Sequence, residues 1–340
     1  MDIIHIIPNL KNGGAENVLV NVALEMGNRG ISQCIFTLFD SKNDFNFLKV
    51  KGIIDVYLLG KDSKNLVQLL QTNNKSIIIC WMYKSIFIYE KLSKKFKVKN
   101  KYYWNIRHSD FGTFQFKQKF FLALMGLYSN ISKCNLIYCS QKSKITHENY
   151  FFKKKNSKVI TNRLAKPIPD NFKNPSKKKY LLFIGRMNSQ KNPKFLKKLF
   201  IYVNSKFDGL QLIILGRGWV KEYFNSNSNS LTIYEQKENV FDYLKHTSCL
   251  LFSSKYGEGY PNVVAEAMAV GAPIIGFDSG DYKVMTKNYK LAKTVESDNE
   301  FLKELEIILK TKPIISINDQ EKITKELNFN ITVKDYIGLI

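Results

Sequence analysis

The chain has 340 residues, of which 44% are hydrophobic and 13% aromatic, and this composition excludes a disordered protein and suffices for two hydrophobic cores. Its five cysteines are scattered and lack metal-binding spacing, which predicts buried, reduced thiols in a cytoplasmic protein. The formal net charge of +23 favours an anionic partner, but no motif of a nucleic-acid-binding module accompanies it, so we expect no nucleic acid.

Short apolar runs alternate with amphipathic stretches of helical length, which predicts an α/β fold with parallel sheets and right-handed crossovers. The first set of predicted strands is Ile3–Ile7, Gln33–Leu38, Ser76–Cys80, Tyr102–Ile106 and Asn135–Cys139. A second set follows a polar, proline-containing stretch at 166–179 and comprises Tyr180–Ile184, Leu212–Leu215, Leu231–Tyr234, Cys249–Phe252 and Ile274–Phe277. We therefore expect two domains, 1–165 and 166–325, and a final segment, 326–340, that crosses back to the first domain.

Two glycines, Gly13 and Gly14, lie between the first predicted strand and a helical pattern over Asn17–Met26. Backbone N–H groups at a helix start can bind an anion, and glycine lets a ligand approach them closely. An ordinary tight turn has the same residues, and the dinucleotide-binding fingerprint is absent. The pair is therefore a candidate phosphate site only in combination with other features.

The densest positive cluster contains six lysines and no acidic residue: Lys91, Lys94, Lys95, Lys97, Lys99 and Lys101. Such a cluster can bind anionic lipid headgroups, or it can be a solvated surface of a lysine-rich protein, and both interpretations stay open. No apolar run reaches the roughly 20 residues of a membrane-spanning helix, and the N-terminus opens into a strand rather than a signal peptide. We expect a cytoplasmic protein, with peripheral attachment to the inner face of the cytoplasmic membrane as an open alternative.

His108 follows the predicted strand Tyr102–Ile106 and has Asp110 two residues later. In open α/β sheets, ligands bind at the carboxyl ends of the strands, which makes His108 a candidate for contact with a substrate hydroxyl. A histidine held by structural hydrogen bonds explains the pattern equally well.

Two cations, Arg186 and Lys191, lie on either side of a loop between the strand Tyr180–Ile184 and the next helical pattern. They suit a diphosphate, because arginine offers a planar fork and lysine a point charge. Most arginines and lysines simply face solvent, and the position at a strand end is what favours function here. Gly216 lies in a third glycine loop at a strand end, which is a weaker signal.

Glu258 lies in a glycine- and proline-containing loop after the strand Cys249–Phe252, and Glu266 lies on the predicted helix Asn262–Ala269. One carboxylate at the helix start and another on the helix itself can hold two parts of an elongated ligand such as a nucleotide-sugar. The chain has no Asp-x-Asp triplet, the usual metal-binding motif for a nucleotide diphosphate. We therefore expect no metal, and fixed positive charges would have to stabilise a departing diphosphate.

Together these motifs resemble those of the retaining glycosyltransferases of the GT-B fold, the glycosyl transferases group 1 family. The segments that carry the resemblance are Gly13–Glu16, Ile184–Arg186 with Lys191-Asn192, and Glu258–Met268 with Gly271–Pro273. The resemblance implies two Rossmann-like domains that face a central cleft, and no cofactor besides the co-substrate. It implies retaining transfer of a hexose or N-acetylhexosamine from a nucleotide-sugar, a UDP-sugar above all. The acceptor would be a saccharide or lipid-linked saccharide in bacterial surface polysaccharide biosynthesis, such as lipopolysaccharide or capsule.

The resemblance also implies residue roles. Arg186 and Lys191 would hold the diphosphate, Glu258 the hydroxyls of the donor sugar, and Glu266 those of the ribose. His108 would lie near the reacting sugar carbon. The remaining donor-binding candidates are backbone or loop positions: Gly13, Gly14, Gly216, Tyr260, Asn262 and Val263.

One departure from the family pattern precedes the predicted linker. Where relatives often have Asn-Gly-hydrophobic-Asp, this chain has Asn162–Ala165. Two other functions remain open: a sugar-nucleotide epimerase or phosphorylase of the same fold, and a non-catalytic sugar- or lipid-binding scaffold.

Overall fold

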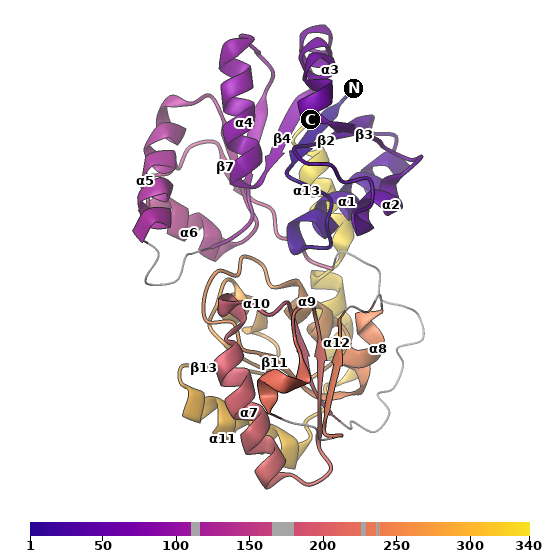
Figure 1. The fold of residues 1–340 in the computed structure, drawn as a ribbon, viewed down its shortest axis with the longest axis vertical. Coiled ribbons are helices and arrows are strands. Elements are labelled where there is room, and N and C mark those ends of the chain that lie inside the picture. Colours follow the sequence, from indigo (N-terminus) through magenta and orange to yellow (C-terminus); the bar gives the residue numbers. More distant parts are fainter. Residues whose placement is uncertain (110–115, 165–179, 226–228, 236, 238) are drawn as a thin grey trace. The chain divides into compact units, whose positions relative to one another are not determined.

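The protein contains two β-sheets of parallel strands, and helices cover each sheet (Figure 1). The computed structural model describes residues 1–109, 116–164, 180–225, 229–235, 237 and 239–340. The chain divides into an N-terminal unit, Met1–Lys166 with Phe329–Ile340, and a C-terminal unit, Pro167–Asn328. The predicted α/β class is confirmed, whereas the predicted linker at 166–179 lies outside the described residues.

The N-terminal sheet has the strand order β3-β2-β1-β4-β5-β6-β7, and all of its neighbouring strands are parallel. Its strands are β1 (Ile3–Ile7), β2 (Gln33–Thr37), β3 (Asp55–Leu58), β4 (Ile77–Trp81), β5 (Tyr102–Ile106), β6 (Asn135–Tyr138) and β7 (Ser157–Val159). Central strands such as β1 and β4 are buried over their whole length because helices cover both faces, which is why they form continuous apolar runs.

Each face of this sheet has its own core. On one face, the core includes residues of α1 (Gly14–Asn28), α2 (Phe45–Val50) and α13 (Phe329–Ile337). On the other, it includes residues of α3 (Leu59–Thr72), α4 (Met82–Lys95) and α5 (Phe116–Ile131). The short helix α6 (Gln141–Asn149) packs beside α5. The five cysteines are buried and form no disulfide, as predicted.

The C-terminal sheet has the order β10-β9-β8-β11-β12-β13 and is also entirely parallel. Its strands are β8 (Tyr180–Ile184), β9 (Gln211–Leu215), β10 (Leu231–Tyr234), β11 (Thr247–Phe252), β12 (Ile274–Phe277) and β13 (Ala292–Val295). The helices are α7 (Pro193–Lys206), α8 (Val240–His246), α9 (Asn262–Ala269), α10 (Tyr282–Thr286), α11 (Asp298–Thr311) and α12 (Ile317–Glu326). Residues of α7 and α11 share one core with the sheet, and α9 packs against α8 and α12.

The last helix, α13, belongs to the N-terminal unit although it follows the C-terminal one. Tyr336 is fully buried and stacks on Trp81 of β4, with ring centroids 5.7 Å apart. Its hydroxyl accepts a hydrogen bond of 2.9 Å from Asn105 Nδ2 on β5, and Thr332 Oγ1 donates to the carbonyl of Thr161 at 2.7 Å. These contacts attach α13 to the carboxyl-end half of the N-terminal sheet and to the segment that leaves it.

The departure from the family pattern falls at this attachment. Arg163 replaces the glycine that the resemblance led us to expect, and it adopts φ +48°, a conformation that favours glycine. Its guanidinium Nη1 lies 3.7 Å from the Asp335 carboxylate on α13, so an ion pair accompanies the unfavourable backbone. At the other end of the helix, Lys101 Nζ donates to the Leu339 carbonyl at 3.0 Å.

Among the described residues, no helix combines the length and the apolar composition needed to cross a membrane.

Candidate active site

The strand order of the C-terminal sheet changes direction between β8 and β11, which are neighbours. From β8 the chain runs outward to β9 and β10, and from β11 it runs to β12 and β13 on the other side. The two loops that leave the carboxyl ends of β8 and β11 therefore diverge, and such a switch point is where open α/β sheets bind ligands. Lys191 follows β8 and Glu258 follows β11.

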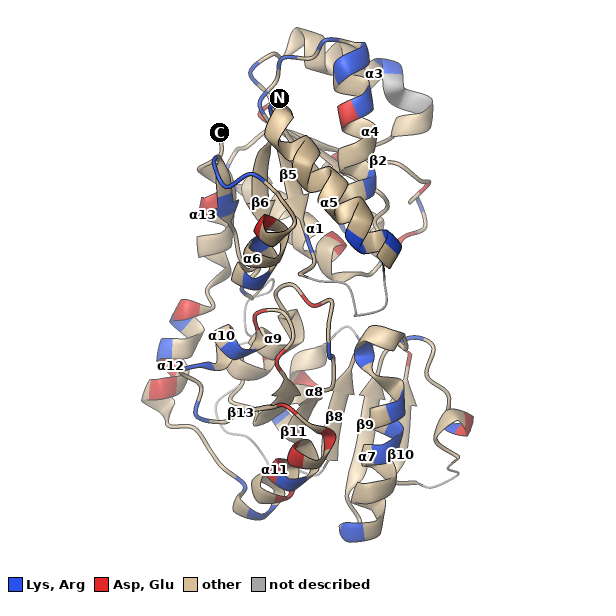
Figure 2. Ribbon diagram, turned by 90° about the vertical axis from the view of Figure 1, so that its left-hand side faces the viewer, with Lys and Arg blue, Asp and Glu red and all other residues tan. Residues whose placement is uncertain are grey.

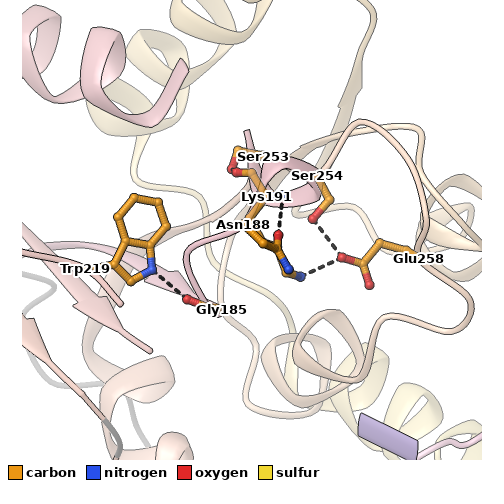
Figure 3. Close-up of polar contacts among 7 residues, drawn as sticks. All are labelled: Gly185, Asn188, Lys191, Trp219, Ser253, Ser254 and Glu258. Carbon is orange, nitrogen blue, oxygen red and sulfur yellow. Dashed lines mark hydrogen bonds and ion pairs between the residues drawn. The ribbon is translucent and has the colours of Figure 1, made fainter. Parts of the chain in front are cut away.

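The structure joins these two side chains directly (Figure 3). Lys191 Nζ lies 2.6 Å from Glu258 Oε1, and Ser254 Oγ donates to the same oxygen at 2.8 Å. The side chains of Lys191 and Glu258 are only 16% and 13% exposed, so water screens their attraction weakly. The second oxygen, Oε2, has no hydrogen-bond partner among the described residues, and it remains available to a ligand.

The backbone of the β8 loop is held by side chains from three segments (Figure 3). Asn188 Oδ1 accepts from the Lys191 N–H at 3.1 Å and closes a 3₁₀ turn, Ser189–Lys191. Ser253 Oγ donates to the Lys191 carbonyl at 2.6 Å, and Trp219 Nε1 donates to the Gly185 carbonyl at 2.8 Å. These contacts fix the backbone from which the Lys191 side chain extends toward Glu258.

The loop that carries Glu258 is supported from the β12 side. The Asp281 N–H donates to the Gly259 carbonyl at 2.9 Å. Gly280 has φ +61°, and a Cβ there would lie 2.6 Å from the Glu258 carbonyl oxygen, so only glycine fits. Gly216 plays a similar part at the β9 end, since a Cβ on it would overlap the Gly185 carbonyl.

The other predicted residues of the C-terminal unit lie in the loops after β8 and β11 and in the helix that follows β11. Arg186 is exposed in the β8 loop, and no carboxylate of the described residues lies within ion-pair distance of it. Helix α9 begins at Asn262, as predicted, and carries Glu266, which is half-buried. Tyr260 is 9% exposed and precedes the helix, and Val263 lies in its first turn.

Gly13 and Gly14 lie at the start of α1 in the N-terminal unit. Gly13 is the N-cap residue and Gly14 the first residue of the helix. The Glu16 side chain folds back toward the helix start, where a Cβ on Gly13 would lie 2.9 Å from its Cδ. An anion that binds this helix start would therefore meet a carboxylate already present there.

His108, in the same unit, lies between two aromatic rings. Its ring centroid is 5.2 Å from that of Tyr83 and 5.4 Å from that of His147, both at steep angles. His147 is buried, with Nδ1 2.6 Å from the Ser143 carbonyl and Nε2 2.6 Å from the Tyr83 hydroxyl. Burial, assisted by His108, lowers the pKa of His147 to about 3, so this ring is neutral at neutral pH. Asp110 lies outside the described residues.

Several residues of the site were missed in the sequence. Ser253 and Ser254 come directly after β11, and polar residues at a strand end were a usable signal. Asn188 and Trp219 gave no local signal, because their partners lie in other segments. Among the described residues, no group of three or more His, Cys, Asp or Glu side chains is arranged to hold a metal ion.

Comparisons with known proteins bear on this site. Residues 166–326 match the family "Glycosyl transferases group 1". An uncharacterized glycosyltransferase of Methanocaldococcus jannaschii is 32% identical over 160 residues, which are 42% of this chain and 39% of that protein. An uncharacterized glycosyltransferase of Haemophilus influenzae is 22% identical over 332 residues, which are 92% of each chain.

Solved structures match over the whole chain. HepE of Anabaena in complex with UDP superposes with a TM-score of 0.79 at 15% identity, over 100% of this chain and 99% of that one. The lipopolysaccharide outer core galactosyltransferase WaaB has a TM-score of 0.69 at 19% identity, over 99% and 98% of the two chains. The chain has the GT-B fold. With the family match to residues 166–326, this GT-B fold supports a nucleotide-sugar glycosyltransferase.

Proposed function

We propose that this protein is a retaining, metal-independent glycosyltransferase that uses a UDP-sugar. It transfers a hexose or N-acetylhexosamine to a saccharide or lipid-linked saccharide acceptor in bacterial surface polysaccharide biosynthesis. The observation that carries the proposal is the Lys191–Glu258 pair at the switch point between β8 and β11. The UDP and UDP-glucose complexes of Anabaena HepE support the donor, and the lipopolysaccharide galactosyltransferase WaaB supports the pathway.

The geometry of the pair suits the two ends of a donor. An ammonium has three N–H donors, and Lys191 uses one toward Glu258, which leaves two for diphosphate oxygens. Arg186 adds a second positive charge from the same loop. Glu258 receives both of its hydrogen bonds on Oε1, so Oε2 can accept from sugar hydroxyls. Glu266, on the helix that follows, holds the ribose hydroxyls in this proposal.

In the proposed reaction, the bond between the sugar carbon and the diphosphate breaks while Lys191 and Arg186 neutralise the charge that develops on the leaving group. The acceptor oxygen bonds to that carbon from the same face, and its proton goes to a phosphate oxygen of the leaving UDP. His108 contacts the donor sugar near the reacting carbon. The products are UDP and a glycoside with the donor's anomeric configuration.

The test is UDP release from a UDP-sugar with acceptor and EDTA present. Lys191→Met should lower kcat/KM by roughly 100-fold or more, because it removes a charge that stabilises the departing diphosphate. Lys290→Met is the matched control. It removes the ammonium of another ion pair, in which Lys290 Nζ lies 2.9 Å from the Asp319 carboxylate. Lys290 comes just before β13, at the amino ends of the strands, whereas the candidate site lies at their carboxyl ends. The activity of this control should stay within about twofold of wild type.

The anomeric configuration of the product, and whether the reaction requires an acceptor or inorganic phosphate, distinguish the alternative functions. A retained anomeric configuration, read from the coupling constant of the product's anomeric proton, is expected, and an inverted one would overturn the retaining assignment. Donor conversion without any acceptor would indicate an epimerase. A requirement for inorganic phosphate would indicate a phosphorylase.

We also propose that the protein meets its acceptor at the inner face of the cytoplasmic membrane. The lysines that would contact anionic headgroups are all exposed: Lys91, Lys94, Lys95, Lys97, Lys99 and Lys101. Binding to anionic vesicles that falls as salt rises is the expected result.

A further inference from the structure

Helix α5 is apolar on two opposite faces. Its inner face, which includes Leu122 and Met125, is buried in the core of the N-terminal unit. The opposite face carries large apolar side chains that are between 49% and 83% exposed: Phe116, Phe120, Leu124, Leu127 and Ile131. At about 100° per residue, these five, the apolar stripe, fall within roughly 80° of the helix circumference. A continuous exposed stripe of this kind marks an interaction surface.

Contacts on the inner side fix how the helix is rotated. Glu90 of α4 is buried, and it accepts hydrogen bonds from the Tyr128 hydroxyl at 2.7 Å and from Ser132 Oγ at 3.0 Å. Gly126 packs so closely on the Tyr150 carbonyl that a Cβ would overlap it. The helix is therefore locked with the apolar stripe outward, and rotation to bury it would break these contacts.

The charged side chains of helix α5 itself are all positive. Helix α5 contains Lys117 and Lys119 but no Asp or Glu, and Figure 2 shows the side of the N-terminal unit on which it lies. Lys94 of the neighbouring helix α4 lies with Nζ 4.6 Å from the centre of the Tyr128 ring on α5. The apolar stripe on α5 thus adjoins α4, which carries Lys91, Lys94 and Lys95 of the lysine cluster.

We propose that α5 inserts the apolar stripe into the interfacial region of an anionic membrane. This deepens, and rests on, the membrane partner proposed above: lysines alone give adsorption to headgroups, whereas the apolar stripe adds burial in the acyl-chain boundary. A second copy of the chain fits less well, because pairing two such faces would oppose their lysines. A nucleic acid would satisfy the lysines but not the apolar side chains.

Flotation with vesicles of phosphatidylglycerol and phosphatidylcholine tests the proposal, with no donor present. Phe120→Gln/Leu127→Gln should lower the partition coefficient at least about tenfold, because it removes two inserted side chains. Leu48→Gln/Ile53→Gln is the control, since these residues of the same unit are also exposed, by 61% and 68%. It should stay within about twofold of wild type. Equal binding by both double variants would overturn the proposal.

A second measurement distinguishes insertion from adsorption. The emission of Phe120→Trp should shift to the blue on vesicles and be quenched by brominated acyl chains, whereas the native tryptophans are buried. Emission that the brominated chains do not quench would overturn the proposal. So would light scattering that shows a dimer of the wild type and a monomer of Phe120→Gln/Leu127→Gln. Transfer to a water-soluble acceptor by Phe120→Gln/Leu127→Gln is measured separately, so a failure here is distinct from a failure of the proposed reaction.

Discussion

The Lys191–Glu258 pair should contribute measurably to the stability of the C-terminal unit, and a double-mutant cycle can show it. Lys191→Met and Glu258→Gln each remove one charge and keep most of the side-chain volume. Each single change leaves the partner's charge without compensation at a site where both side chains are less than one-fifth exposed. Breaking a buried pair costs about 3–5 kcal/mol and breaking an exposed one about 0–1 kcal/mol. We expect about 2 kcal/mol for each single variant.

The double variant should cost clearly less than the sum of the two, because it leaves no uncompensated charge. We expect a coupling free energy of about 1–2 kcal/mol. The assay is urea unfolding followed by circular dichroism, with the transition of each unit fitted separately. Lys290→Met and Asp319→Asn form the control cycle on an exposed pair, where the coupling should stay below about 0.5 kcal/mol. Additivity of the Lys191 and Glu258 variants within about 0.3 kcal/mol would refute the reasoning.

Three further changes test other parts of the structure. Between pH 7.5 and 5.5 the free energy of unfolding should fall by about 3 kcal/mol. Burial lowers the pKa of His5 to about 4 and that of His147 to about 3, so below about pH 6.5 the unfolded chain binds protons that the folded chain does not. Urea titrations in which the free energy of unfolding does not fall over this pH range would contradict the prediction. Glu90→Leu should cost about 3 kcal/mol in thermal unfolding, because one buried and two half-buried donors lose their acceptor, whereas Glu90→Gln should cost about half as much. Gly280→Ala should lower the free energy of unfolding by about 1–2 kcal/mol more than Gly209→Ala, and it should weaken UDP binding measured by calorimetry. Both glycines have positive φ, but of the two only Gly280 has backbone atoms at the position that a Cβ would take. Equal effects of the two substitutions would contradict this packing.

The sequence predicted the central strands well because helices bury them on both faces. Strands β1, β5, β8 and β12 lie inside the sheets and have the predicted bounds. The edge strand β10 has them too, because Leu231–Tyr234 still forms a short, largely apolar run. The edge strands β3 and β13 were missed, since Asp55–Leu58 and Ala292–Val295 are partly exposed and contain polar residues, so they form no apolar run. An edge strand is defined by its pairing with a distant neighbour, and a local pattern carries little of that information.

The candidate site, too, could be predicted from the sequence only where its residues follow a local pattern. Lys191 and Glu258 could be selected because each follows an apolar strand and precedes a helix, which is a local pattern. That β8 and β11 are neighbours depends on the order of strands in the sheet, and only the family resemblance implied it. His147 carried no signal at all, because its partners Tyr83 and His108 are 64 and 39 residues away in the chain.

In the proposed reaction, the Glu258 carboxylate has one role before the donor binds and another after it has bound. A lysine side chain that is only 16% exposed requires a negative partner when no ligand is bound, since an uncompensated charge there would be costly. Glu258 supplies that charge and, through Ser254, is itself held in place. In the proposed reaction the diphosphate brings its own negative charge to Lys191, so the carboxylate can turn its free oxygen to the sugar without leaving the ammonium uncompensated. Among the residues that the structure describes, Arg186 has no carboxylate at ion-pair distance, so in this proposal its side chain can adapt to the diphosphate while Lys191 stays paired with Glu258. In the proposed reaction the two cations therefore differ in role: Lys191 is positioned by Glu258 before the donor binds, and Arg186 adjusts to the bound diphosphate.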